Sequence, residues 1–347
     1  MKWILAAVGI LLLAAGIFGL HTLLVAGELK RLEPHFAGSC QAVNGVPGPE
    51  DITIDPGSGT AFVSSDVSPA ARGAGSVRGE IYAYDLNSPD PEPINLTGNF
   101  PGAFHPHGIS LYSEPGCTRL FVVNHRSGGD GIEIFDVRDG TLHHVRTVDG
   151  DLLSTPNDVL AIGPERFYAT NDHGSATALG RTLEDYLRLP RGNVVYFDGI
   201  RFSVAARRIR YANGINRSID GRSVYVASTT GLRIRVYRRD PADGALTFQR
   251  DIRLRTGVDN IEVDDLGRLW VGCHPKLLTF SKHFADPVRP SPSQVLKITL
   301  PPGGQVSVEE VFLDSGEMLS GSSVAAVYRQ QMLIGAVLRD RFLHCRF

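Results

Sequence analysis

Five residue pairs, four of which carry carboxylate or amide side chains, stand directly before a branched apolar residue. They are Glu50-Asp51, His107-Gly108, Asn157-Asp158, Asn213-Gly214 and Asp259-Asn260. Hard oxygen donors of this kind suit calcium, which takes about six to eight oxygens in flexible geometry. Zinc would instead require nitrogen and sulfur from His and Cys. The pairs therefore predict a calcium site, provided that the fold brings them together.

The pairs belong to an internal repeat. In each copy a gap with Gly or Pro follows the branched residue, and a run of aromatic and β-branched residues comes next. A weaker sixth copy begins at Ser322-Ser323. The anchor residues of the six runs lie 45 to 63 residues apart and are Phe62, Phe121, Phe167, Tyr225, Trp270 and Leu333. Six copies of this size predict an all-β fold, a six-bladed β-propeller of four-stranded blades.

The rest of the body, from about His35 onward, shows almost no helical periodicity. It is a series of short β-rich runs separated by Gly, Pro, Asn and Asp, as a propeller requires. Nine of these runs are predicted as strands, at residues 60–64, 80–84, 120–124, 132–137, 193–197, 223–227, 233–237, 269–272 and 295–298.

The phase of the repeat predicts where the polar pairs lie. The same position in every blade faces the same place, so the pairs should converge on one mouth of the central channel. The converging residues are Glu50, His107, Asn157, Asn213, Asp259 and Asn260. The alternative is that Asp and Asn simply favour turns. That alternative explains Asp55, Asp220 and Asp264, which lie in Gly-containing turns, better than it explains the pairs.

A second cation is expected deeper in the channel. Asp51 and Asp158 each lie one residue beyond the mouth and share one phase of the repeat. Two carboxylates at equivalent depth favour a second calcium ion. The alternative is that both are ordinary buried carboxylates held by hydrogen bonds.

A calcium ion with open coordination positions polarises a carbonyl or phosphoryl oxygen, and it stabilises the oxyanion formed when water attacks an ester or lactone. Such a reaction also needs a proton acceptor near the metal. His107 lies in the ring, and His125 ends the next strand behind it. His173 and His274 end equivalent strands in later blades, where a structural role is the simpler interpretation.

The N-terminus contains an apolar stretch from Trp3 to Gly27, 25 residues that are long enough to span a bilayer. Its length favours an uncleaved signal anchor over a cleaved signal peptide. We therefore expect an anchor at residues 1–27 and a propeller domain at 28–347 that is exposed outside the cytoplasm, or secreted if the anchor is cut. Sequons at Asn95 and Asn216 agree with that compartment.

The composition argues against three other classes of protein: nucleic-acid binders, zinc proteins and disulfide-rich scaffolds. With 35 Lys and Arg against 37 Asp and Glu, the formal net charge is −2, which argues against a nucleic-acid partner. Four cysteines without CxxC spacing form neither a zinc site nor a disulfide scaffold.

Several motifs resemble the serum paraoxonase/arylesterase family. They cover most of the chain in order: Pro-Glu-Asp at 49–51, His-Pro-His-Gly-Ile at 105–109, Val-Val-Asn-His at 122–125, Pro-Asn-Asp at 156–158, Ala-Asn-Gly-Ile-Asn at 212–216, Val-Asp-Asn-Ile at 258–261 and Trp-Val-Gly-Cys-His-Pro at 270–275. The resemblance implies a six-bladed propeller with two calcium ions that hydrolyses lactones, aryl esters and, in some members, organophosphates.

The resemblance also implies roles for individual residues. The catalytic calcium would be held by Glu50, Asn157, Asn213, Asp259 and Asn260, and the structural calcium by Asp51, Asp158 and the backbone carbonyl of Ile109. His107 and His125 match a general-base dyad, although Glu50 is an alternative base. Cys40 and Cys345 match a disulfide that joins the first and last strands, while Cys273 matches an unpaired cysteine. Cys117 has no clear counterpart and is expected to be a free thiol.

Two segments depart from the family pattern, so the substrate preference does not carry over. They are residues 66–78, rich in Ala, Gly and Ser, and residues 276–290. Two other classes stay open at this point. One is a gluconolactonase-type hydrolase, which uses one metal ion and generally lacks the disulfide and the histidine pair. The other is a membrane-tethered propeller that binds a partner without catalysis.

Overall fold

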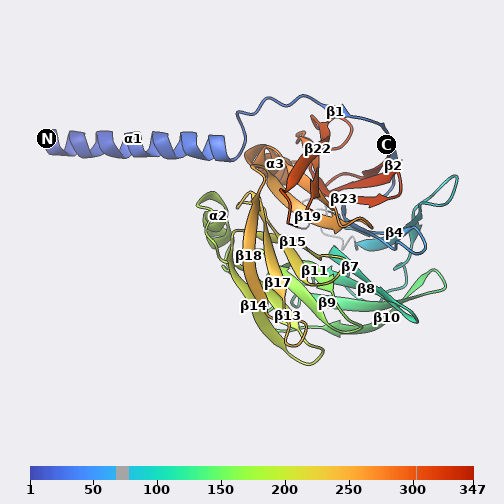
Figure 1. Cartoon of the computed structure of the whole chain (residues 1–347). Coiled ribbons are helices and arrows are strands. Elements are labelled where there is room, and N and C mark those ends of the chain that lie inside the picture. The colour runs from blue at the N-terminus through green and yellow to red at the C-terminus, as the bar shows by residue number, and fades with distance from the viewer. Residues whose placement is uncertain (68–77, 302) are drawn as a thin grey trace.

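Six antiparallel sheets surround a central axis in the computed structural model, which describes residues 1–67, 78–301 and 303–347 (Figure 1). This arrangement confirms the predicted six-bladed propeller for the described part of the chain. The segment 66–78, which departs from the family pattern, falls mostly on residues 68–77, outside the described residues. All nine predicted strands are present, most of them one to three residues longer than the sequence pattern indicated.

The first four blades follow the chain in order. Blade 1 contains β3 (Pro49–Ile54), β4 (Thr60–Ser65), β5 (Glu80–Asp85) and β6 (Ile94–Asn95). Blade 2 contains β7 (Pro106–Glu114), β8 (Cys117–Asn124), β9 (Gly131–Arg138) and β10 (Thr141–Val148). Blade 3 contains β11 (Pro156–Ala161), β12 (Phe167–Asn171), β13 (Gly192–Phe197) and β14 (Phe202–Ile209). Blade 4 contains β15 (Ala212–Arg217), β16 (Ser223–Ser228), β17 (Arg233–Arg239) and β18 (Leu246–Arg253).

The last two blades also take strands from the N-terminal segment. Blade 5 contains β19 (Gly257–Val263), β20 (Leu269–His274), β21 (Ser293–Thr299) and β22 (Ser307–Asp314), with β1 (His35–Phe36) added at its outer edge. Blade 6 contains β23 (Ser322–Tyr328), β24 (Gln331–Ala336), β25 (Arg341–Arg346) and, as its outermost strand, β2 (Ser39–Asn44).

The hydrophobic core lies between neighbouring blades. All six predicted anchor residues are buried. Phe121 of blade 2 and Phe167 of blade 3, for example, pack with their ring centroids 5.9 Å apart. Burying such a side chain contributes about 1.5–3 kcal/mol. Because each interface is built from the same position of the repeat, the interfaces together generate the ring.

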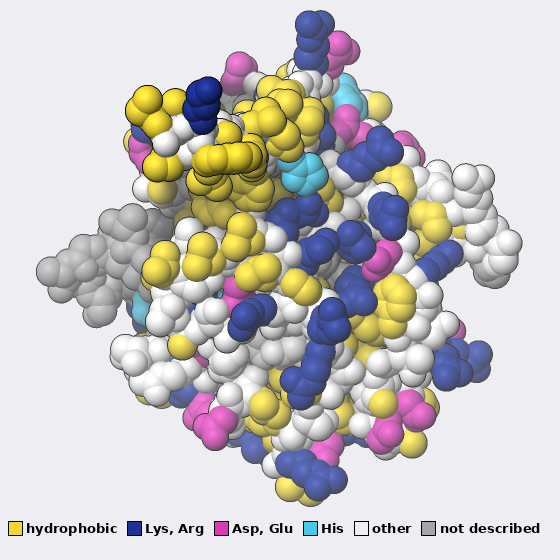
Figure 2. Space-filling view, turned by 90° about the vertical axis from the view of Figure 1, so that its left-hand side faces the viewer, with side chains coloured by type: hydrophobic (Ala, Val, Ile, Leu, Met, Phe, Trp, Pro, Cys, Tyr) yellow, Lys and Arg dark blue, Asp and Glu magenta, His cyan; other side chains and the backbone are white. Residues whose placement is uncertain are grey.

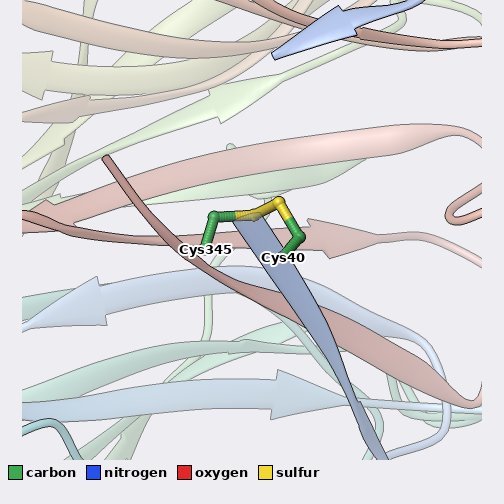
Figure 3. The surroundings of a disulfide bond; sticks show 2 residues. All are labelled: Cys40 and Cys345. Carbon is green, nitrogen blue, oxygen red and sulfur yellow. A yellow bond between two sulfur atoms is a disulfide. The ribbon is translucent and has the colours of Figure 1, made fainter. Parts of the chain in front are cut away.

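The two ends of the chain close the ring in blade 6. Strand β2 pairs antiparallel with β25, and the register places Cys40 opposite Cys345. The two cysteines form a disulfide across 305 residues (Figure 3), which confirms the pairing that the resemblance implied. Cys273 is free and buried, and Cys117 is free and half-buried, also as expected.

Three helices occur in the described residues. α1 (Lys2–Val25) projects away from the propeller with no buried residue, and it is long and apolar enough to cross a membrane. α2 (Ala178–Tyr186) and α3 (Leu277–Ala285) lie in the connections after β12 and β20. Neither α2 nor α3 was predicted from the sequence, because a nine-residue helix shows too few turns to reveal a period.

The disulfide provides the first test. Cys40→Ala combined with Cys345→Ala should lower the free energy of unfolding by up to about 5 kcal/mol, because the unfolded chain regains the freedom of a very long loop. The measurement is urea denaturation of the full chain in detergent, followed by circular dichroism. Cys117→Ala is the control and should leave the midpoint unchanged. An unchanged midpoint for the double variant would show that strand pairing alone closes the ring.

Candidate active site

Each innermost strand carries a β-bulge at its polar pair. In β3 the register with β4 shifts between Pro49 and Ile52, and the five other inner strands shift at the equivalent place. A bulge leaves residues unpaired and re-aims their side chains. Both members of the first pair therefore contact other blades: Glu50 accepts from the side chain of Asn260 in blade 5, and Asp51 accepts from the amide of Ile109 in blade 2.

The five predicted ligands of the catalytic calcium lie on the innermost strands β3, β11, β15 and β19 and are all buried. They are Glu50, Asn157, Asn213, Asp259 and Asn260. Four of them contribute a buried oxygen that has no hydrogen-bond partner: Glu50 Oε2, Asn157 Oδ1, Asn213 Oδ1 and Asn260 Oδ1. Leaving a buried acceptor unpaired costs about 1–3 kcal/mol, so four at one place indicate a missing partner.

Protein contacts orient these oxygens. The amide nitrogen of Asn213 donates to Thr229 Oγ1 at 3.1 Å, and that of Asn260 donates to Glu50 Oε1 at 2.8 Å. With the nitrogens engaged, the amide oxygens remain available. His274, which the sequence suggested as structural, lies 2.8 Å from Asp259 Oδ2 through its Nε2 and stacks on Phe280. It is therefore a positioning residue for Asp259.

The electrostatics of the mouth also suit a cation. Burial, followed by the charges of Asp51, Asp259 and Asp158, raises the pKa of Glu50 well above its usual value. A bound cation would relieve that repulsion. Among the described residues no three His, Cys, Asp or Glu side chains gather as a metal site, so the donor set depends on its amide oxygens. Two carboxylates and three amides fit calcium.

The deeper pair is held by backbone groups. Asp51 accepts from the amides of Ile52 at 2.9 Å and Ile109 at 2.7 Å. Asp158 accepts from Val159 and Ile215, both at 2.7 Å. These bonds support the alternative that Asp51 and Asp158 are buried carboxylates held by hydrogen bonds. Each carboxylate oxygen still keeps a further lone pair that a cation could use. Burial raises the pKa of Asp51 to about 7 despite those bonds.

The two candidate base histidines lie side by side. The ring centroids of His107 and His125 are 5.2 Å apart, and His107 Nε2 lies 3.7 Å from Glu50 Oε1. Burial, and then the neighbouring His125, lowers the pKa of His107 to about 3, so its imidazole is neutral at ordinary pH. His125 is oriented by Asp130, whose Oδ1 lies 3.2 Å from its Nδ1.

Beyond the predicted mouth ligands and the deeper pair of Asp51 and Asp158, the channel contains a third polar layer that was not predicted from the sequence. Glu262 lies in β19 two residues after Asn260, and Asn216 in β15 donates to its carboxylate at 3.3 Å. Burial and the charges of Asp51 and Asp158 raise the pKa of Glu262 well above its usual value. Residues two apart on a strand share a face, so the repeat phase could have revealed this layer. The side-chain nitrogen of Asn216 also donates to the carbonyl of Ile261, so it is not free to carry a glycan. Asn95, in the other sequon, is exposed.

His173, which follows strand β12, contacts helix α2 through an ion pair. Its Nδ1 lies 2.8 Å from Asp172 Oδ1, and its Nε2 lies 3.1 Å from Asp185 Oδ1 on α2. Burial alone would lower the pKa of His173, but the hydrogen bonds and charges of the two carboxylates raise it to about 10. His173 is therefore an imidazolium between two carboxylates.

This ion triad predicts a pH dependence. The folded pKa of His173 is raised, so its stabilising contribution is complete below about pH 6.5 and is lost as the pH rises towards 10. The difference in melting temperature between the native chain and His173→Gln should be largest at pH 6 and shrink steadily to pH 10. A difference that stays constant over this range would contradict the charged triad.

Comparisons with known proteins agree with the propeller fold. Three propellers of low identity share the fold alone. The luciferin-regenerating enzyme has a TM-score of 0.58 at 13% identity over 90% of this chain and 96% of its own. A gluconolactonase from Xanthomonas campestris has a TM-score of 0.55 at 15% identity over 91% and 94%. The calcium-binding protein regucalcin from Agrobacterium tumefaciens has a TM-score of 0.54 at 16% identity over 89% and 93%.

Sequence relatives are much closer. Serum paraoxonase/arylesterase 2 of Gallus gallus is 37% identical over 353 residues, which cover 96% of this chain and 98% of the relative. Serum paraoxonase/arylesterase 1 of Homo sapiens is 37% identical over 91% of each chain. The sequence model of the arylesterase family matches residues 32–347, the whole of the propeller. This chain therefore belongs to the arylesterase family.

Proposed function

We propose that the chain is a calcium-dependent hydrolase of lactones and aryl esters, with its active site at the channel mouth. Family membership supports the reaction class. The single observation that supports a metal site is the set of four buried oxygens without a hydrogen-bond partner, on Glu50, Asn157, Asn213 and Asn260. Glu50, Asn157, Asn213, Asp259 and Asn260 would hold the catalytic ion. Asp51, Asp158 and the carbonyl of Ile109 would hold a second, structural ion.

When bound, the catalytic calcium supplies a Lewis acid for the carbonyl oxygen of the ester or lactone. His107, whose Nε2 lies 3.7 Å from Glu50 Oε1, would accept a proton from the attacking water. His125 packs against His107 and is itself oriented by Asp130. His274 keeps the Asp259 carboxylate in place through its 2.8 Å contact.

The N-terminal helix supports a membrane location. α1 is a candidate membrane span whose side chains contact no core, so we propose that residues 1–27 anchor the propeller domain, residues 28–347, outside the cytoplasm. If the anchor is cut, the propeller is secreted. In either case Asn95 is the sequon that a glycosylating enzyme could reach.

Calcium removal tests the metal. Chelation should abolish hydrolysis of phenyl acetate and of a lactone panel, and calcium should restore it. Asp259→Ala should lower the calcium bound per chain, measured by atomic emission, and should remove the calcium-induced rise in melting temperature. Asp220→Ala removes an exposed carboxylate and is the matched control. Full hydrolysis after complete calcium loss would refute the proposal.

The base is tested separately. His107→Gln should lower kcat about a hundred-fold or more while calcium binding, measured by calorimetry, stays intact. His143→Gln alters an exposed histidine on β10 and should change neither quantity. If His107→Gln lowers kcat on lactones only slightly, Glu50 is the base instead. Its Oε1 lies 3.7 Å from His107 Nε2.

The two other classes make different predictions. A gluconolactonase-type hydrolase would bind one divalent ion, and the structural similarity to such an enzyme concerns the fold alone. The Cys40–Cys345 disulfide and the adjacent pair of His107 and His125 favour the two-ion class instead. A propeller that only binds a partner would retain calcium but hydrolyse no member of the ester and lactone panel.

A further inference from the structure

Arginine side chains gather at the mouth end of blades 3 and 4. Strand β14 carries Arg207 and Arg208 near its end, and Arg210 follows it. Strand β18 ends at Arg253, and Arg255 comes two residues later. Both outer strands end on the side where the inner strands begin, because the four strands of a blade alternate in direction. We call these five residues the arginine surface.

The positive charge of this surface is not neutralised locally. Among the described residues the nearby carboxylate of Asp251 pairs with Arg233 and Arg235, and no carboxylate pairs with the five arginines. Strands β14 and β18 contact each other across the interface between blades 3 and 4. Arg235 on the neighbouring strand β17 also reaches β14, where it donates to the carbonyl of Arg208 at 3.2 Å. Burial, and then the charges of Arg210 and Arg233, lowers the pKa of Arg188. A chain of net charge −2 thus concentrates positive potential at one place.

The end of α1 is attached beside this surface. Lys30 Nζ donates to the carbonyl of Arg255 at 2.7 Å, and the amide of Leu277 on α3 donates to Ala26 at 2.9 Å. Glu28 accepts from the first amides of α3, Leu278 at 2.8 Å and Thr279 at 3.1 Å. These contacts hold the residues that follow the candidate span directly against blade 5.

Gly27 allows this close attachment. Its φ is +77°, and a Cβ atom there would lie 2.2 Å from the carbonyl oxygen of Pro275. The junction between α1 and the propeller is therefore a fixed contact rather than a free linker. Figure 2 shows the result from the side of α1: a band of Lys and Arg side chains crosses the face from which the helix projects.

We propose that the arginine surface binds the phosphate groups of anionic lipids in the bilayer that holds α1. This rests on the proposed function in one respect, the placement of α1 in a membrane. Guanidinium groups bind phosphate oxygens in pairs, and each basic residue near an anionic surface contributes about a five-fold gain in binding. Lipid is the favoured occupant because the attachment of Ala26, Glu28 and Lys30 places headgroups next to these arginines at all times.

The test uses the full chain reconstituted into phosphatidylcholine vesicles with and without phosphatidylglycerol. Spin-labelled lipids measure which headgroup the protein immobilises. The native chain should prefer phosphatidylglycerol by about five-fold or more at low salt, and high salt should weaken the preference. Arg207→Gln, Arg210→Gln and Arg253→Gln together should remove most of the preference while hydrolysis in detergent stays unchanged.

The matched control removes three arginines from the opposite end of the propeller, by Arg138→Gln, Arg201→Gln and Arg222→Gln. It changes the net charge equally and should keep the preference. The proposal that the arginine surface binds lipid would be overturned if the control lost the preference for phosphatidylglycerol, or if the mouth-end variant kept it. Neither result would bear on the membrane anchor. A native chain that fails to float with either kind of vesicle would refute the membrane anchor, and the lipid site with it.

Discussion

Two buried carboxylates connect the inner strands of neighbouring blades, and the geometry of the channel depends on them. Asp51 accepts the amide of Ile109 from blade 2, and Asp158 of blade 3 accepts the amide of Ile215 from blade 4. A β-bulge releases such amides from the sheet, so they need acceptors, while a buried carboxylate needs donors. The bulge and the carboxylate therefore stabilise each other. Neutral side chains also link the inner strands, since Asn260 of blade 5 and Ser323 of blade 6 both donate to the carbonyl of Glu50 in blade 1.

This arrangement accumulates negative charge on the axis of the propeller. Burial together with the neighbouring carboxylates raises the pKa of Glu50 and of Glu262. The three amides at the mouth supply oxygen donors without adding charge, which limits the repulsion that folding must overcome before a cation binds. The unpaired oxygens of Asn157 and Asn213 are consistent with a site organised for a ligand at some cost in stability.

Much of the fold could be predicted because the repeat is local. The anchor residues, from Phe62 to Leu333, share one pattern, and each is buried between blades as expected. The two helices at the mouth could not be predicted in this way. α2 depends on the contact between His173 and Asp185, and α3 begins on the carboxylate of Glu28, which lies about 250 residues away in the sequence. Pairings over that distance leave no periodic signal.

The sequence by itself determined the number of blades and the place of each polar pair, because both follow from the phase of a repeated unit. Only the tertiary structure decided which atoms face the channel. Glu50 and Asn260 are 210 residues apart, yet their hydrogen bond engages the Asn260 nitrogen and leaves its buried oxygen without a protein partner. Asp51 and Asp158 share the phase of the predicted ligands, but one oxygen of each also accepts a backbone amide from the next blade. Such contacts arise when six similar sheets close into a ring, and the order of residues within one repeat does not contain them.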